Sequence, residues 1–245
     1  MLTGVELAAA IAIVMLGGVV LGTVSFGLGS VAAPVLLLLI GAKPTVVIVN
    51  TFIVVQLSLV LSGTWRHIDI RLTKWMILGG ICAAPIGVFV LNIAAPSVLR
   101  IAIGVVIVVM GLLSLRETKF PLATFPGSGI VYGFATCLTT TAISIGGPLG
   151  GIYAVAQRWP TQTARAALAV MFSVSSLLAV VLFALTGLYT RDTLINAGLL
   201  LPGLLAGFGI ARVLVGRLNQ QAFRRAVIVI VVLAGCMLLV REILG

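Results

Sequence analysis

Long apolar runs follow one another through almost the whole chain, and each is close to or longer than a membrane span. They occupy residues 5–41, 45–64, 75–92, 98–115, 129–157, 162–187, 193–215 and 222–240. An α-helix needs about 20 apolar residues to cross the hydrocarbon core of a bilayer. Of the 245 residues, 61% are hydrophobic and 8% are charged. The chain is therefore predicted to be an all-α integral membrane protein, since the alternating pattern of a transmembrane β-barrel is missing.

The charged residues and cysteines exclude several other classes. Basic residues flank the apolar runs without interleaved aromatic residues, so we attribute the net charge of +10 to membrane topology and expect no nucleic acid partner. Cys82, Cys137 and Cys236 lie in apolar runs without CxxC spacing, so we expect neither a metal site nor a cofactor. The N-terminus has no basic segment, and we expect no cleaved signal peptide.

Glycine and hydroxyl residues interrupt two of the runs. The first interruption, at residues 22–30, reads GTVSFGLGS, and the second, at residues 136–148, reads TCLTTTAISIGGP. The first broken segment, 5–41, is longer than one span and shorter than two comfortable ones. Polar groups in lipid need partners or a function, so we expect the two interruptions to meet and form a binding site.

The two halves of the chain repeat the same pattern. Residues 100–117 and 225–242 both run sixteen positions from an arginine to an Arg-Glu pair. The broken segments also correspond, through Gly18 and Gly22 with Gly129 and Gly133, and through Pro34 with Pro148. The sequence therefore predicts two membrane repeats, 1–117 and 128–245, joined by a cytoplasmic linker at 118–127.

The Lys and Arg residues discriminate between two topologies. If both broken segments cross the membrane, these residues divide eight to seven between the two sides. If both are re-entrant hairpins, leaving six full spans, they divide eleven to four. The positive-inside rule favours re-entrant hairpins, with both termini outside and the two repeats inverted. The first arm, 5–24, is itself long enough to cross the membrane, so the alternative topology, in which the broken segment is one kinked span, is retained.

An interrupted helix is suited to binding a small anion. The second arm begins with unpaired N–H groups at the positive end of a helix dipole, and glycines let a ligand approach the backbone. For any one of these residues the alternative role is helix packing, hydrogen bonding across helices, or anchoring of a basic side chain. The predicted substrate-binding residues are Ser25, Gly27, Gly29, Ser30, Asn50, Gln56, Thr139, Thr140, Ser144, Gly146, Gly147 and Arg165.

Catalytic chemistry is not expected. All five acidic residues fall at run ends or in loops, so no span carries a carboxylate for a proton relay. The serines of the interruptions have no nearby His, Asp, Glu or Lys to act as a base, and no Walker motif is present. We therefore expect that the protein is not an enzyme.

The glycine pattern resembles the sulfite exporter TauE/SafE family of small anion permeases. The residues that carry the resemblance are Gly18, Gly22, Gly27, Gly29 and Pro34 in the first half, and Gly129, Gly133, Gly146, Gly147, Pro148 and the Arg165-Ala166 pair in the second. The resemblance covers essentially the whole chain and implies transport of sulfite, sulfonates or related anions. Residues 30–32 depart from the family pattern, where a glycine run is common.

The resulting prediction is a secondary transporter in the bacterial inner membrane, and specifically an exporter of sulfite, sulfoacetate or another organosulfonate. The anion and the lipid bilayer are the expected partners, and a homodimer is one option for the oligomeric state. The alternatives are a channel-like pore or an importer for another small anion or solute, and a non-transporting subunit of a membrane assembly.

Overall fold

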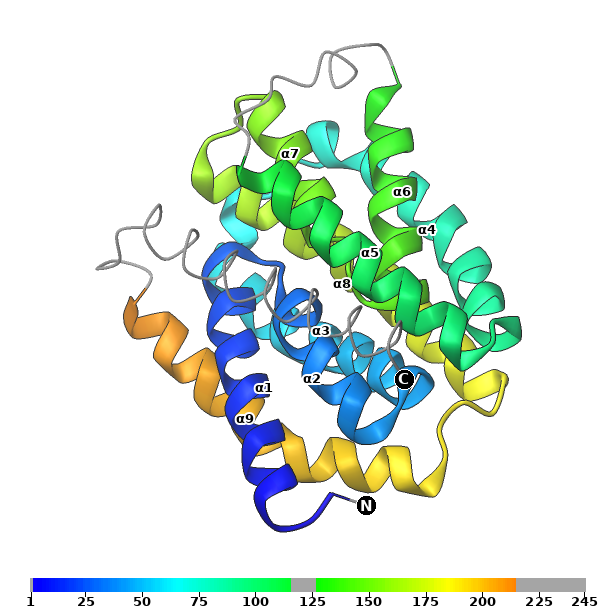
Figure 1. Cartoon of the computed structure of the whole chain (residues 1–245). Helices are drawn as coiled ribbons and strands as arrows, with labels where there is room; N and C mark the ends of the chain where they lie inside the picture. Colours follow the sequence, from blue (N-terminus) through cyan, green and yellow to red (C-terminus); the bar gives the residue numbers. More distant parts are fainter. Residues whose placement is uncertain (1, 116–126, 215–245) are drawn as a thin grey trace.

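The structure is a computed structural model that describes residues 2–115 and 127–214, and within these ranges the chain is helical with no strand (Figure 1). The helices are α1 (Gly4–Val24), α2 (Leu28–Ile40), α3 (Ala42–Thr64), η1 (Trp65–His67), α4 (Ile70–Ile93), α5 (Pro96–Leu115), α6 (Ser128–Ile143), α7 (Gly147–Ala156), α8 (Thr161–Leu185) and α9 (Arg191–Leu214). The predicted linker except Gly127, the predicted span at 222–240, Cys236 and the repeat match at 225–242 lie outside the described residues.

Five helices, α1, α3, α4, α8 and α9, are long and apolar enough to cross a membrane. Large apolar side chains also face outward from the bundle, among them Phe89 of α4 and Leu177 of α8. A surface of this kind is suited to lipid rather than water, because lipid imposes no penalty on exposed apolar groups. For the described residues, the prediction of an all-α chain with helices able to span a membrane is confirmed.

The loop before α4 is shorter than expected. The polar residues 65–74, between the apolar runs 45–64 and 75–92, predict a loop, but η1 and α4 occupy most of this stretch. The Asp69 carboxylate caps α4 by accepting hydrogen bonds from the backbone N–H groups of Arg71 (2.9 Å) and Leu72 (3.4 Å). Because this cap satisfies N–H groups of the first turn, the helix begins within the polar sequence and the predicted boundary is wrong.

Glycines let two pairs of helices pack in parallel. A Cβ atom at Gly207 of α9 would lie 2.3 Å from the Met15 carbonyl oxygen of α1, and one at Gly203 would lie 2.9 Å from that of Ile11. Between α4 and α6, a Cβ atom at Gly133 would lie 2.3 Å from the Met76 carbonyl oxygen. The backbones of α1 and α9, and those of α4 and α6, are thus in contact at these positions.

Two breaks in the helical backbone reverse the chain. We call residues 25–27 break 1 and residues 144–146 break 2. Ser25 (φ 66°) and Ser144 (φ 64°) both adopt the left-handed conformation, which ends α1 and α6. After break 1, Leu28 lies beside Gly17, so α2 folds back along α1. After break 2, the Tyr132 ring of α6 lies 5.0 Å from the Tyr153 ring of α7, so α7 folds back along α6.

The turns of the bundle gather at two ends. The Lys43 ammonium donates a hydrogen bond to the Asn92 carbonyl oxygen (2.7 Å), which places the start of α3 beside the end of α4. In Figure 1 the α2–α3, α4–α5 and α8–α9 turns lie toward the lower right, while α6 begins at the upper end. Each broken pair therefore starts and finishes toward one end of the bundle, α1–α2 at the lower end and α6–α7 at the upper end.

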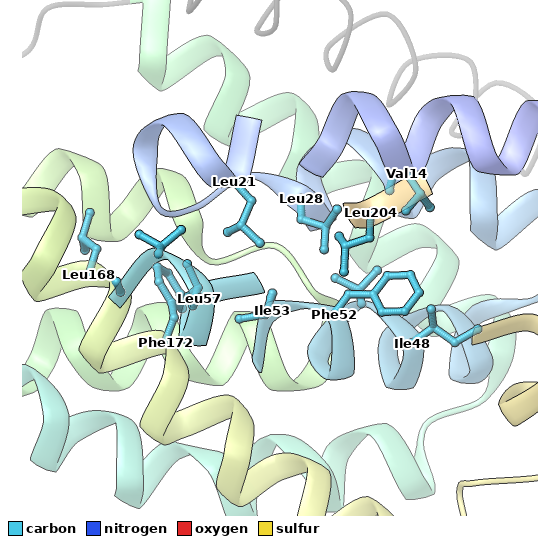
Figure 2. Close-up of a cluster of buried hydrophobic side chains, with 14 of the residues drawn as sticks. Val14, Leu21, Leu28, Ile48, Phe52, Ile53, Leu57, Leu168, Phe172 and Leu204 are labelled. Atoms are coloured by element: carbon cyan, nitrogen blue, oxygen red, sulfur yellow. The ribbon is translucent and has the colours of Figure 1, made fainter. Parts of the chain in front are cut away.

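The buried core joins both halves of the chain. Leu21 and Leu28, which flank break 1, pack with Phe52 and Ile53 of α3, and Phe172 of α8 belongs to the same cluster (Figure 2). Deeper in α3, the Asn50 side chain accepts a hydrogen bond from the Ser176 hydroxyl of α8 (3.3 Å). Helices α3 and α8 thus form the shared wall against which the breaks are held.

Candidate functional site

A small pocket lies between the two breaks. Its lining consists of Leu21, Phe26, Gly27, Gly29, Ser30, Ile53, Thr140, Ser144, Gly146, Gly147 and Phe172. Ile53 and Phe172 are near the midpoints of α3 and α8, so the pocket lies at half the height of these two spans. The volume open to the centre of a water molecule is about 10 Å³, which is room for about one water.

Backbone contact between the halves closes one side of this pocket. A Cβ atom at Gly29 would lie 1.7 Å from the Ser144 carbonyl oxygen, so no larger residue fits there without a shift. Gly146 is enclosed within its own half, because a Cβ atom there would lie 1.9 Å from the Thr136 carbonyl oxygen of α6. The predicted meeting of the two interruptions is present in the structure, and Gly29 allows it.

Break 1 presents several backbone donors. The first intrahelical hydrogen bond of α2 runs from the Val31 N–H to the Gly27 carbonyl oxygen (3.1 Å). The preceding N–H groups, of Leu28, Gly29 and Ser30, have no partner within the helix, as in the first turn of any α-helix. The dipole of the 13-residue α2 adds partial positive charge at this end. This arrangement is suited to an anion.

Break 2 presents fewer backbone donors. Pro148 has no N–H group, and the N–H groups of Leu149 (3.1 Å) and Gly150 (3.5 Å) both point to the Gly146 carbonyl oxygen. In the first turn of α7 only the Gly147 N–H is left without a partner among the described residues. Unpaired N–H groups were expected at both breaks, and the structure shows more of them at break 1 than at break 2.

Two serine hydroxyls complete the polar lining. Ser30 and Ser144 are 7% and 3% exposed, and within the described part of the chain neither hydroxyl has a hydrogen-bond partner. A buried hydroxyl without a partner is unfavourable, and such groups occur at binding sites. The hydroxyls of Thr139 and Thr140 differ, because each donates to a carbonyl oxygen one turn earlier in α6, at 2.8 Å and 2.7 Å.

Asn50 and Gln56 lie outside the pocket lining. The Asn50 amide donates to the carbonyl oxygens of Val46 (2.9 Å) and Thr140 (3.1 Å), so it ties α3 to the end of α6. The Gln56 amide donates to the Gly18 carbonyl oxygen of α1. Both side chains are fully buried and hydrogen-bond across helices, which was the alternative role considered for them.

Arg165 also lies outside the lining and contacts the end of α1. Its guanidinium donates to the Gly22 carbonyl oxygen (3.0 Å) and to the Gln162 side chain (3.3 Å). Gly22 belongs to the last turn of α1, where carbonyl groups lack helical partners and the helix dipole is negative. Arg165 therefore caps α1 immediately before break 1.

Sequence reasoning missed the apolar part of the lining. Leu21, Phe26, Ile53 and Phe172 face the pocket, and only Phe26 carries a local signal, since it stands between a serine and a glycine within the break. Ser25 was predicted to bind substrate. It is fully buried in break 1, its hydroxyl has no partner among the described residues, and it is not part of the lining.

The described residues contain no cluster of His, Cys, Asp or Glu that could hold a metal ion. Glu6, Asp69 and Asp192 are exposed at helix starts. The groups that line the pocket are neutral, so the site offers hydrogen bonds and helix-end partial charges rather than a formal charge.

Comparisons with known proteins agree with the resemblance noted above. Searches of curated proteins and of solved structures gave no match. A family model described as Sulfite exporter TauE/SafE matches residues 10–238, which include both breaks and nearly the whole chain. Members of this family are membrane transporters of sulfite or related anions. The chain therefore belongs to the sulfite exporter TauE/SafE family.

Proposed function

We propose that the protein is a secondary transporter that exports a small sulfur-containing anion, such as sulfite, sulfoacetate or another organosulfonate, across the bacterial inner membrane. The anion binds in the pocket between the breaks, near the middle of the bilayer. The observation that carries this proposal is the set of unpartnered donors around the pocket, namely the N–H groups at the start of α2 and the hydroxyls of Ser30 and Ser144.

This donor set matches the chemistry of a sulfur oxyanion. A sulfonate or sulfite group has three oxygens and no bulky substituent around them, so it can accept several converging N–H and O–H bonds. Hydrogen bonds to a charged partner are worth about 1.5–3 kcal/mol each, which offsets part of the desolvation of the anion. The apolar side chains of Leu21, Ile53 and Phe172 suit the short carbon chain of an organosulfonate.

The two repeats are proposed to be inverted copies of each other. If the second half is superposed on the first, α6 takes the place of α1, and α9 takes the place of α4. The parallel pair α1–α9 then corresponds to the parallel pair α6–α4, and both pairs are in contact through glycines. The pocket residues Ile53 and Phe172 stand at the same distance from Ser25 and Ser144 in the sequence. These correspondences support an inverted repeat with its site at the interface of the halves.

The end of the bundle that carries η1 is proposed to face the cytoplasm. Arg66 stacks on Trp65 (5.3 Å) and Lys74 on Trp75 (5.0 Å), and the rings of Tyr153 and Trp159 lie 5.6 Å apart at the end of α7. Tryptophan and basic residues together are typical of a cytoplasmic membrane interface. A membrane potential that is negative inside drives an anion outward by about 2.3 kcal/mol per charge per 100 mV, which is the direction of export.

Flux of sulfite and sulfoacetate into or out of proteoliposomes containing the purified chain tests this proposal. We expect saturable flux that increases with a potential driving the anion, because a binding site of fixed capacity limits the rate. Flux that stays linear with concentration would favour the channel-like alternative, and the absence of any flux would overturn the proposal.

Serine variants test the site itself. Ser30→Ala and Ser144→Ala each remove one hydroxyl donor, and we expect each to weaken sulfite binding by about tenfold, the equivalent of about 1.4 kcal/mol. Ser58→Ala is the matched control, because the Ser58 hydroxyl is on the exposed side of α3 and donates to Val54 within its own helix. If all three variants bind sulfite equally, the site is elsewhere.

A further inference from the structure

The pocket is too small for the anion proposed to bind there, and this inference rests on the proposed function. About 10 Å³ is open to the centre of a water molecule, whereas a sulfite or sulfonate group has four heavy atoms. An anion that enters the pocket completely therefore has to displace one of the lining groups.

Phe26 is the lining side chain with the fewest restraints. Leu21, Ile53 and Phe172 are on helices and are at most 5% exposed. Phe26 is only partly buried, and it lies in break 1 between two left-handed residues, Ser25 and Gly27 (φ 104°). No helical hydrogen bonds hold this residue in place, so its ring can be displaced without unfolding a helix turn.

The Phe26 ring rests on a surface of α7 that has no side chains. A Cβ atom at Gly147 would lie 2.6 Å from the Phe26 Cδ2 atom, and one at Gly151 would lie 2.9 Å from Cζ. These two glycines are four residues apart and so lie on the same helix face. Gly147 also lines the pocket, and its N–H group is the one in the first turn of α7 that has no partner within the described part of the chain. The ring thus spans the gap between the two halves beside the anion donors.

The corresponding position in break 2 is not equivalent. Ile145 stands between Ser144 and Gly146 as Phe26 stands between Ser25 and Gly27, but Ile145 is only 1% exposed and does not line the pocket. Break 1 therefore has the less restrained side chain, and it also has most of the unpartnered N–H groups.

We propose that Phe26 is the gate of the anion site and that its ring sets the upper size limit of the transported anion. When the ring leaves Gly147 and Gly151, it opens the pocket and uncovers the N–H groups of α2. When it returns, it packs against the carbon chain of a bound organosulfonate and excludes one that is too bulky.

The selectivity of transport between a bulky sulfonate and sulfite tests whether Phe26 is the gate. In proteoliposomes, Phe26→Ala is expected to raise the transport of a bulky sulfonate such as benzenesulfonate relative to sulfite by about tenfold or more. Gly151→Ala, which displaces the ring without removing it, is expected to change this ratio in the same direction. Phe89→Ala is the matched control, because Phe89 is 61% exposed on α4, away from the pocket. An unchanged ratio in Phe26→Ala overturns the gate.

A labelling experiment separates failure of the gate from failure of the proposed function. Ser30→Cys in a cysteine-free background places a thiol in the pocket, and its reaction with a small water-soluble methanethiosulfonate reports access without any transport. If the open state is at most about a tenth populated, removing the ring speeds labelling by about tenfold or more. Equal labelling rates with Phe26→Ala and with Phe89→Ala overturn the gate, even if sulfite flux is observed. Faster labelling without sulfite flux supports the gate and overturns the proposed substrate.

Discussion

At the scale of single residues, Arg165 illustrates how a charged side chain beside a site can act without touching its ligand. Its guanidinium is bonded to the Gly22 carbonyl oxygen and to Gln162, and it does not line the pocket. We expect Arg165→Ala to lower the free energy of unfolding by about 1.5–3 kcal/mol, since a bond to a charged donor is lost and the end of α1 is left uncapped. SDS-induced unfolding of the purified protein in detergent micelles measures this.

Arg71→Ala is the control for Arg165, because Arg71 is exposed near the start of α4 and we expect its removal to be almost neutral. Equal stabilities for the two variants would contradict the capping role. A loss of sulfite affinity in Arg165→Ala without a loss of stability would instead identify Arg165 as a direct counter-ion of the substrate.

Asn50, like Arg165, was predicted to bind substrate, and its hydrogen bonds in the structure indicate that it joins helices instead. Its amide joins α3 to the Thr140 carbonyl oxygen just before break 2, and its carbonyl oxygen accepts from Ser176 of α8. Asn50→Leu is expected to lower the free energy of unfolding by about 1–3 kcal/mol, because buried polar partners lose their bonds. The same unfolding assay measures this, with Ser58→Ala as the reference. A neutral effect would show that the three helices meet without this bond.

At the scale of helices, two glycines of α9 provide an internal comparison. A Cβ atom at Gly207 would lie 2.3 Å from the Met15 carbonyl oxygen of α1, whereas Gly209 has nothing within 4 Å. Gly207→Ala is expected to force α1 and α9 apart and to lower the unfolding temperature. Gly209→Ala is expected to raise stability by about 0.5–1 kcal/mol, because alanine favours the helix. Similar effects of the two substitutions would contradict the close packing of α1 against α9.

The helices were largely predictable from the sequence, because runs of apolar residues and their glycine and proline boundaries are local features. The start of α4 was not, since the Asp69 cap overrides the polarity of the residues that follow. The unequal donors of the two breaks were also missed. The absence of an N–H in Pro148 is visible in the sequence, but the bonding of Leu149 and Gly150 to the Gly146 carbonyl oxygen depends on the backbone of α7.

In the candidate site too, local sequence features were predictable, and features that depend on helix packing were not. Glycines and serines in two interruptions were enough to predict where the halves meet, because polar residues in apolar runs are conspicuous. Asn50, Gln56 and Arg165 were conspicuous for the same reason, and the structure shows them bonded to backbone carbonyl groups outside the pocket lining. The apolar lining from Ile53 and Phe172 could not be found by composition, since these residues resemble every other apolar residue of α3 and α8 until the helices are packed.

At the scale of the whole molecule, the two broken pairs are arranged so that each returns toward the end of the bundle from which it started (Figure 1). If both pairs re-enter, the start of α1 and the start of α3 lie on one side of the membrane, and η1 and the end of α7 lie on the other. The excess of Lys and Arg at η1, at the start of α4 and at the end of α7 then favours the cytoplasm for that side under the positive-inside rule.

Single reporter cysteines test this topology. In a background without Cys82, Cys137 and Cys236, we expect Thr3→Cys and Lys43→Cys to react with a membrane-impermeant maleimide in intact cells. Arg66→Cys and Arg158→Cys are expected to react only after permeabilisation, because the positive-inside rule keeps their loops in the cytoplasm. If Thr3→Cys and Lys43→Cys react from opposite sides, the α1–α2 pair crosses the membrane as a kinked span and the inverted arrangement is wrong. If all four reactivities are reversed, the arrangement of the halves holds, but the side assigned to the cytoplasm is wrong.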